Sequence, residues 1–355
     1  NRWNFEFDHR STPDYYQSLG VGVYEYFLLA EDLGAEPMPI LNCGMACQFN
    51  TGELAPLDEL DPYIQDALDL IEFANGPIDT EWGRKRADMG HPEPFHLTML
   101  GIGNEQWGPQ YIERYKPFAE AIQERHPEIR LIAATGSDAT IFPNGEAEVA
   151  YLWEQWKELK PHIVDEHFYR SPEWFLKNVN RYDEYERGSS EVFVGEYAAQ
   201  SVGVGSPNNR NTWKTALYEA AFMIGMERNA DLVTMSCYAP LLAHTEAWQW
   251  KPDLIYFDNL RVLRSANYYV QQLFSQNLGT HLLETTIENS PMINADLQGF
   301  HATTALDTGT NEIILKVVNA TDQAVLSPIS IRGQDVDNTT GTVRILTAES
   351  VSAEN

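Results

Sequence analysis

Residues 97–108, Leu-Thr-Met-Leu-Gly-Ile-Gly-Asn-Glu-Gln-Trp-Gly, join a short apolar run to a turn that carries a carboxylate. The run has the length of one buried strand, and the glycines after it are typical of a loop. Similar runs recur roughly 30–60 residues apart with helix-like segments between them, a rhythm typical of βα units with a parallel sheet. The expected strands are 38–44, 97–103, 130–134, 162–168, 191–195 and 231–237.

The segments between these runs show helical periodicity. Helices are expected at 23–33, 64–74, 111–125 and 213–226, each ending near a glycine, a proline or a change of pattern. Six strands fit either an open doubly wound sheet or an α/β (β/α)₈ TIM barrel that lacks its first two units. The first residues, Asn1-Arg2-Trp3, contain neither an initiator Met nor a signal peptide, so they resemble the interior of a longer chain and favour the barrel.

The sequence texture changes after a last helical pattern at 268–274. Strand-like alternation with Gly, Asn and Thr turns follows, at 300–306, 311–318, 324–331 and 341–346. We therefore expect a barrel over residues 1–278 and a C-terminal β-sandwich domain over residues 279–355.

Composition excludes several classes of protein. The 355 residues carry a formal charge of −28 with 12% aromatic residues, which argues against nucleic acid as a partner and favours a neutral or cationic ligand. The apolar runs are far shorter than the roughly 20 residues of a membrane span. Cys43, Cys47 and Cys237 have neither zinc-site nor disulfide-framework spacing, although Cys43 and Cys47 would be able to pair in an exported protein.

Two carboxylates stand at the C-terminal ends of expected strands, Glu105 after 97–103 and Glu196 after 191–195. That end of a barrel is the catalytic face. Trp107 would desolvate Glu105 and raise its pKa for general acid work, while a Tyr hydroxyl would keep Glu196 ionised as a nucleophile. The alternative for either Glu is a helix cap or an ion pair with Arg. Flanking glycines make this less attractive for both together, because glycine lets a ligand approach closely.

Five further residues are candidates for sugar binding. Asn104 can donate its amide to a sugar hydroxyl or make a local turn bond. Alternation places His167 and Tyr169 on one face of their strand, where His167 lines a subsite or is a satisfied core histidine. Trp248 and Trp250 follow the last strand and either stack on sugar or pack in the core.

At these residues the chain resembles the α-L-arabinofuranosidases of glycoside hydrolase family 51, from about residue 1 to 278. The matching stretches are Ala30-Glu-Asp-Leu-Gly-Ala-Glu-Pro37, Gly90-His-Pro-Glu-Pro-Phe95, Gly103-Asn-Glu-Gln-Trp-Gly108, Asp165-Glu-His-Phe-Tyr169, Gly195-Glu-Tyr-Ala198, Glu219-Ala-Ala-Phe-Met-Ile-Gly225 and Ser236-Cys-Tyr-Ala-Pro-Leu-Leu242. The Gly-Asn-Glu motif alone is shared by many barrel glycosidases. The Arg-x-Pro-Gly-Gly motif of the family and its upstream sugar-binding Glu are not found in this sequence.

The resemblance implies an exo-acting retaining enzyme without metal or organic cofactor, acting on arabinose-containing oligo- or polysaccharides, and often a homo-oligomer. It assigns the acid/base to Glu105 and the nucleophile to Glu196. It also places Asn104 on the sugar 2-hydroxyl, Tyr169 on the nucleophile and His167 along the subsite. Export from the cell is expected. The alternatives are an endo-glucanase or xylanase on the same barrel, and a non-catalytic carbohydrate-binding fragment.

Overall fold

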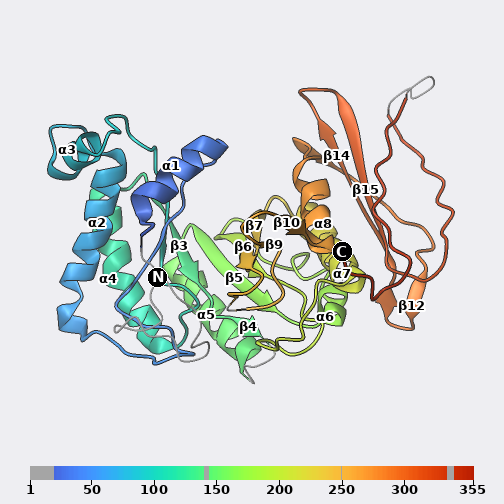
Figure 1. Cartoon of the computed structure of the whole chain (residues 1–355), viewed down its shortest axis with the longest axis horizontal. Coiled ribbons are helices and arrows are strands. Elements are labelled where there is room, and N and C mark those ends of the chain that lie inside the picture. The colour runs from blue at the N-terminus through green and yellow to red at the C-terminus, as the bar shows by residue number, and fades with distance from the viewer. Residues whose placement is uncertain (1–19, 140–143, 249, 334–339) are drawn as a thin grey trace.

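The computed structural model describes residues 20–139, 144–248, 250–333 and 340–355. Its centre is a parallel sheet with the strand order β1-β2-β3-β5-β6-β7 (Figure 1). All six strands expected from the sequence are present, and the prediction of parallel βα units is confirmed. Their bounds are β1 Ile40–Leu41, β2 Met99–Ile102, β3 Arg130–Ala134, β5 Ile163–Tyr169, β6 Glu191–Tyr197 and β7 Val233–Tyr238, and the short β4 Asp138–Ala139 pairs with β5.

Within the described residues, β1 and β7 each pair with a strand on one side only, so this sheet is a barrel part with two free edges. Helices pack on its outer face, where they bury two large apolar clusters. The helices are α1 Val23–Leu33, α2 Asp61–Asn75, α3 Glu81–Asp88, α4 Pro109–Arg125, α5 Gly145–Leu159, α6 Pro172–Lys177, α7 Trp213–Arg228 and α8 Ala266–Ser275, with a 3₁₀ turn at Leu57–Glu59. Of these, α3, α5 and α6 were not expected from the sequence.

Strand alternation decides which side chains point to the interior of the sheet and which point to the helices. On β5, Phe168 faces the helices and packs against Trp174 and Phe222. Its neighbours His167 and Tyr169 must then point to the interior, because successive side chains of a strand alternate between faces. The sequence pattern predicted this pairing of His167 with Tyr169.

The C-terminal region consists mainly of antiparallel strands, as expected for a sandwich-like domain. A three-stranded sheet has the order β11-β14-β15, and a hairpin pairs β12 with β13. Their bounds are β11 His281–Leu283, β12 Met292–Asn294, β13 Leu297–Gln298, β14 Phe300–Asp307 and β15 Glu312–Asn319. A smaller sheet of β8 Leu242–His244, β9 Ile255–Phe257 and β10 Val262–Arg264 lies in the connection after β7.

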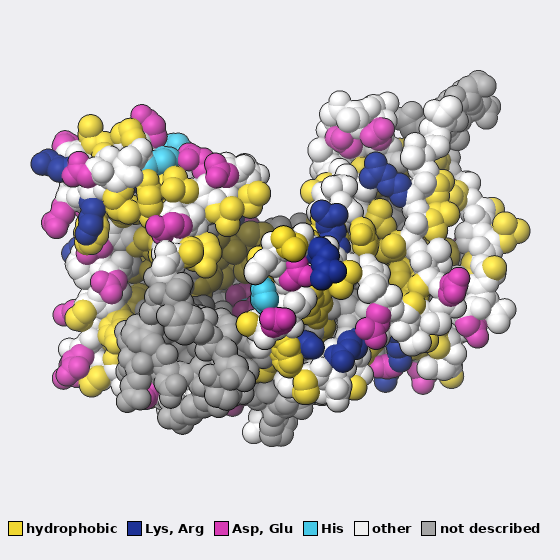
Figure 2. Space-filling view, viewed as in Figure 1, with side chains coloured by type: hydrophobic (Ala, Val, Ile, Leu, Met, Phe, Trp, Pro, Cys, Tyr) yellow, Lys and Arg dark blue, Asp and Glu magenta, His cyan; other side chains and the backbone are white. Residues whose placement is uncertain are grey.

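The strands expected at 324–331 and 341–346 are wrong, because these residues form no strand. Apolar side chains in both stretches face solvent, Leu326 at 96% and Val343 at 80% exposure. An alternating pattern forms a strand only where a neighbouring strand accepts its hydrogen bonds, and the described residues supply none here. Figure 2 shows apolar side chains across this C-terminal part.

No helix in the described ranges has the length and apolar character that a membrane crossing needs. The three cysteines are free. Cys43 is buried, Cys47 is half-buried, and Cys237 lies exposed on β7.

Candidate active site

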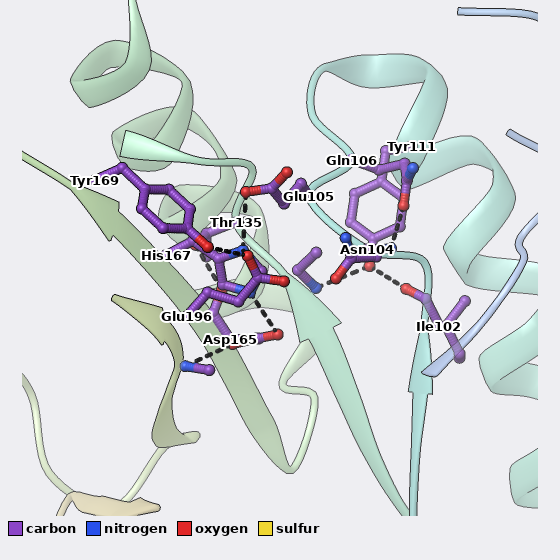
Figure 3. Close-up of polar contacts among 12 residues, drawn as sticks. Ile102, Asn104, Glu105, Gln106, Tyr111, Thr135, Asp165, His167, Tyr169 and Glu196 are labelled. Carbon is purple, nitrogen blue, oxygen red and sulfur yellow. Dashed lines mark hydrogen bonds and ion pairs between the residues drawn. The ribbon is translucent and has the colours of Figure 1, made fainter. Parts of the chain in front are cut away.

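Glu105 lies in the turn after β2, with a side chain that is 18% exposed. The backbone there is unusual: Gly103, Glu105 and Gly108 all have positive φ, at 77°, 57° and 79°. Glycine adopts this conformation freely, whereas a non-glycine residue is strained in it and needs support from its surroundings. The turn therefore holds Glu105 in a costly conformation that aims its carboxyl toward β5 (Figure 3).

Three side chains supply that support. The Tyr111 hydroxyl of α4 donates to the Ile102 carbonyl at 2.6 Å and accepts from the Ala134 N–H at 2.9 Å, which ties the ends of β2 and β3 together. The Gln48 amide pairs with both backbone groups of Trp107, at 2.9 and 3.1 Å. The Gln106 side chain accepts from the Asn104 N–H within the turn.

Glu196 lies on β6 and faces Glu105 across His167. The Tyr169 hydroxyl donates to Glu196 Oε2 at 2.5 Å. His167 Nδ1 lies 3.0 Å from Glu105 Oε1 and 3.5 Å from Glu196 Oε2, and its Nε2 lies 3.1 Å from Asp165 Oδ2. Four of the residues predicted from sequence, on three different strands or strand ends, thus meet in one cluster (Figure 3).

The electrostatics of this cluster differ from the expectation. Burial raises the pKa of Glu196 above its ordinary range, and the nearby Glu105 adds to this, whereas His167 and the Tyr169 hydroxyl lower it. The predicted hydrogen bond from Tyr169 is therefore present, but it does not outweigh desolvation. Burial lowers the pKa of His167, yet the surrounding carboxylates of Glu196 and Asp165 and the bonds to Asp165 and Glu105 raise it well above its ordinary value.

The tryptophans lie apart from this cluster. Trp248 lines a cavity of about 260 Å³ together with Arg210 and Tyr256, and neither Glu105 nor Glu196 lines it. The Lys251 ammonium lies 4.2 Å from the Trp248 ring centre and so covers one face that a sugar would use. Trp250 lies against the loop after β6, with a ring carbon 3.5 Å from where a Cβ on Gly205 would stand.

In Figure 3, Asn104 lies beside Gln106 and Tyr111, apart from Glu196 and Tyr169. A role for its amide in binding sugar stays a prediction, as do stacking roles for the two tryptophans.

Sequence reasoning missed Asp165, Gln48 and Tyr111. Asp165 had a usable signal, because it stands two residues before His167 and must share its face of the strand. Gln48 and Tyr111 had no such signal in the sequence, because both bind backbone atoms. Gln48 binds the backbone of a residue 59 positions away, and Tyr111 binds a carbonyl 9 positions away.

Glu105, His167 and Glu196 offer one ligand atom each within 4.8 Å of one another, a spacing that a metal ion is also able to use. The same oxygens are needed as proton donor and nucleophile in two-carboxylate chemistry, which uses no metal.

Comparison with known families resolves the ancestry. Residues 4–187 match the α-L-arabinofuranosidase 1 domain, and residues 195–355 match the α-L-arabinofuranosidase C-terminal domain. A solved family 51 α-L-arabinofuranosidase with bound arabinose shares 32% identity, with a TM-score of 0.72 over 84% of this chain and 46% of that one.

The chain belongs to the α-L-arabinofuranosidases of glycoside hydrolase family 51.

Curated relatives of this family 51 chain include bacterial and plant proteins. An extracellular exo-α-L-arabinofuranosidase of Streptomyces chartreusis is 42% identical over 319 residues, which cover 88% of this chain and 36% of the relative. α-L-Arabinofuranosidase 2 of Arabidopsis thaliana is 31% identical over 96% of this chain and 47% of its own length. The chain thus spans less than half the length of these relatives.

Proposed function

We propose that the protein is a retaining, exo-acting α-L-arabinofuranosidase that removes terminal α-L-arabinofuranosyl residues from plant cell-wall oligo- or polysaccharides. The observation that carries this proposal is the pair Glu105 and Glu196, with carboxylate oxygens within 4.8 Å of each other in a cluster with His167. Retaining glycosidases hold their two carboxyl groups about 5–5.5 Å apart, whereas inverting enzymes need about 6.5–9.5 Å to admit a water.

In the proposed reaction, Glu196 attacks the anomeric carbon while Glu105 protonates the leaving oxygen. The bond to the aglycone breaks as the bond to Glu196 forms, which gives an arabinosyl-enzyme. Glu105, now a carboxylate, takes a proton from water, and that water releases the sugar with its configuration retained. The Tyr169 hydroxyl holds the Glu196 oxygen in place for attack.

The names of the relatives support the choice of substrate. The Streptomyces protein is called an extracellular exo-α-L-arabinofuranosidase, and the similar solved structure holds arabinose. We accordingly assign an arabinose-containing substrate and an extracellular site of action. As a separate part of the proposal, residues 1–278 form the barrel part and residues 279–355 form a β domain. A homo-oligomer is part of the same proposal.

The direct test is hydrolysis of an aryl α-L-arabinofuranoside by the protein and by Glu196→Gln. The wild-type protein should release the phenol and α-configured arabinose, observed by NMR at early times. Glu196→Gln should be inactive, and azide should restore turnover with inverted arabinosyl azide as the product. Activity of Glu196→Gln near that of the wild type, or inverted arabinose from the wild-type protein, would refute the mechanism.

The exo mode is tested separately with arabinan and with xylan. Monomeric arabinose as the first product supports it. Internal cleavage of the xylan backbone without arabinose release would instead support the endo-acting alternative.

A further inference from the structure

A β-bulge in β6 turns Glu196 toward the interior of the sheet. Asp165 on β5 pairs with Phe193, but His167 pairs with Glu196, so two residues of β6, Val194 and Gly195, stand opposite one residue of β5. Strict alternation from the interior residue Phe193 would place Gly195 inside and Glu196 against the helices. The extra residue reverses this, because a bulge re-aims the side chains that follow it.

The bulge frees one backbone donor, and a side chain accepts from it. The Gly195 N–H donates to Asp165 Oδ1 at 3.1 Å. The residue must be glycine, since a Cβ there would stand 2.1 Å from the same oxygen. The other oxygen of Asp165 bonds His167 Nε2 at 3.1 Å, and the Asp165 side chain is only 7% exposed.

We propose that Asp165 is a positioning residue of the catalytic site, which locks the bulge that aims Glu196 and orients the His167 ring by accepting a hydrogen bond from its Nε2. It touches neither the sugar nor the reacting atoms and acts through these two hydrogen bonds. The inference rests on the proposed function, because it assigns a role within the same reaction. One buried carboxylate thereby sets both the direction of the nucleophile and the hydrogen-bonding state of the histidine between the two catalytic acids.

Asp165→Asn separates this role from simple packing, because the amide keeps the size of the side chain but accepts hydrogen bonds on one atom only. Its oxygen can serve the Gly195 N–H or His167 Nε2, and its NH₂ group then opposes the other donor. While His167 Nε2 carries a proton, the variant therefore breaks one of the two hydrogen bonds in either orientation. ¹⁵N NMR of protein labelled at histidine and glycine reports whether His167 Nε2 carries a proton, and the Gly195 amide signal reports the bulge.

The expected kinetic result is a loss of kcat on the order of 10²-fold with little change in KM, the usual effect of a displacement of about 1 Å at a reacting group. The acid limb of the pH profile of kcat/KM should also move, because His167 and Asp165 both influence the ionisation of Glu196. The proposal would be overturned if NMR showed that Asp165→Asn breaks one of the two hydrogen bonds while kcat and the pH profile stayed at their wild-type values.

Phe168→Leu is the matched control. Phe168 lies on the same strand with its ring against the helices, so the variant should lower thermal stability without moving the pH profile. If Phe168→Leu shifts the pH profile as Asp165→Asn does, the effect is one of general destabilisation and the proposal fails.

A double-mutant cycle tests whether Asp165 and Gly195 act through one contact. Asp165→Ala removes the acceptor and Gly195→Ala places a Cβ against it, so the double variant should lose much less activity than the product of the two single losses. Losses that multiply would contradict a shared role.

Failure of the proposed function has a different signature. In that case the protein does not hydrolyse arabinofuranosides, or Glu196→Gln hydrolyses them normally, while the NMR arm still reports whether Asp165 fixes His167 and the bulge. Wild-type behaviour of Asp165→Asn beside an inactive Glu196→Gln would refute the positioning role alone.

Discussion

Glu219 on α7 is a fully buried carboxyl without a cationic partner among the described residues, and replacing it with Gln should make the protein more stable at high pH. Its oxygens accept from the Ala199 N–H at 2.7 Å and from the Asn267 amide at 2.6 Å. Burial nevertheless raises the pKa of Glu219 to about 8, against the lowering effect of these two bonds. The folded protein therefore binds a proton at neutral pH that the unfolded chain releases.

The magnitude follows from linkage. Moving a pKa from 4.5 to about 8 corresponds to roughly 5 kcal/mol, at about 1.4 kcal/mol for each tenfold change in proton affinity. Because the pKa is higher in the folded state, this stabilisation is full below about pH 4.5, falls as the pH rises, and is gone above about pH 8. Glu219→Gln removes the titration. Its NH₂ group opposes the Asn267 amide, at a cost of about 1 kcal/mol for the broken bond.

The assay is urea unfolding of both proteins between pH 5 and pH 9. Because Gln matches the neutral carboxyl apart from the broken bond, the free energy of unfolding of the wild type minus that of Glu219→Gln should become negative between about pH 5 and pH 6. It should then fall by about 1.4 kcal/mol for each pH unit until it levels off above about pH 8. Other titrating groups cancel in this difference. A difference that does not change with pH would mean that Glu219 is already ionised in the folded protein, and the reasoning from burial would be refuted.

Three further predictions concern the site and the buried ion pair on the helix side of β5. Glu105→Ala should slow a natural arabinofuranoside on the order of 10²–10⁴-fold but an activated aryl arabinofuranoside much less in its first step, with a burst of phenol in stopped flow; equal losses and no burst would place the acid elsewhere. Tyr169→Phe removes a hydrogen bond that lowers the pKa of Glu196, so the acid limb of kcat/KM should move to higher pH, and an unmoved limb would contradict that bond. Arg181→Met strands the buried Glu166, whose pKa burial raises but Arg181 lowers below its usual value; chemical unfolding should show a loss of about 3–5 kcal/mol, and a loss below about 1 kcal/mol would show that the pair is weak.

The strands of the sheet were predictable because each is a short apolar run between helical segments. Sequence periodicity did not predict every helix and strand correctly, because tertiary contacts also decide which segments form them. The helix α5, Gly145–Leu159, begins at a glycine without a side-chain cap. The helix α6 has a Ser171 cap and a proline at its first position, but its six residues are too few to show a helical period. The stretches 324–331 and 341–346 were predicted as strands because their alternation is clear. They form none, since the described residues offer them no strand to pair with.

Some features of the candidate site were likewise predictable from the sequence, and others were not. Glu105 and Glu196 were visible because each follows an apolar strand, and Tyr169 was visible from its spacing to His167. The bulge was not predicted, because Gly195 was interpreted as the end of the strand 191–195, although a glycine within a strand also favours a bulge. The raised pKa of Glu196 was also missed, because it depends on how much water the surrounding walls exclude, which the sequence pattern does not contain.

Buried hydrogen bonds to the helices hold each of the three strands that form the site. The end of β2 is tied to α4 by the Tyr111 hydroxyl, and the residues just after β6 are tied to α7 by Glu219. In the middle of β5, Glu166 points to the helices and accepts bonds from Trp153, Arg181, Tyr182 and Tyr185, all within 3.2 Å.

Each of these tethers places a polar group in an otherwise apolar layer, where burial costs free energy unless the group is fully bonded. Apolar packing alone would hold the helices against the sheet, but it is non-directional and tolerates small rotations of a strand. Hydrogen bonds with defined geometry do not tolerate such rotations. The protein thus uses buried polar contacts on the helix side of the sheet to fix, on the opposite side, the angle at which Glu105 and Glu196 face each other.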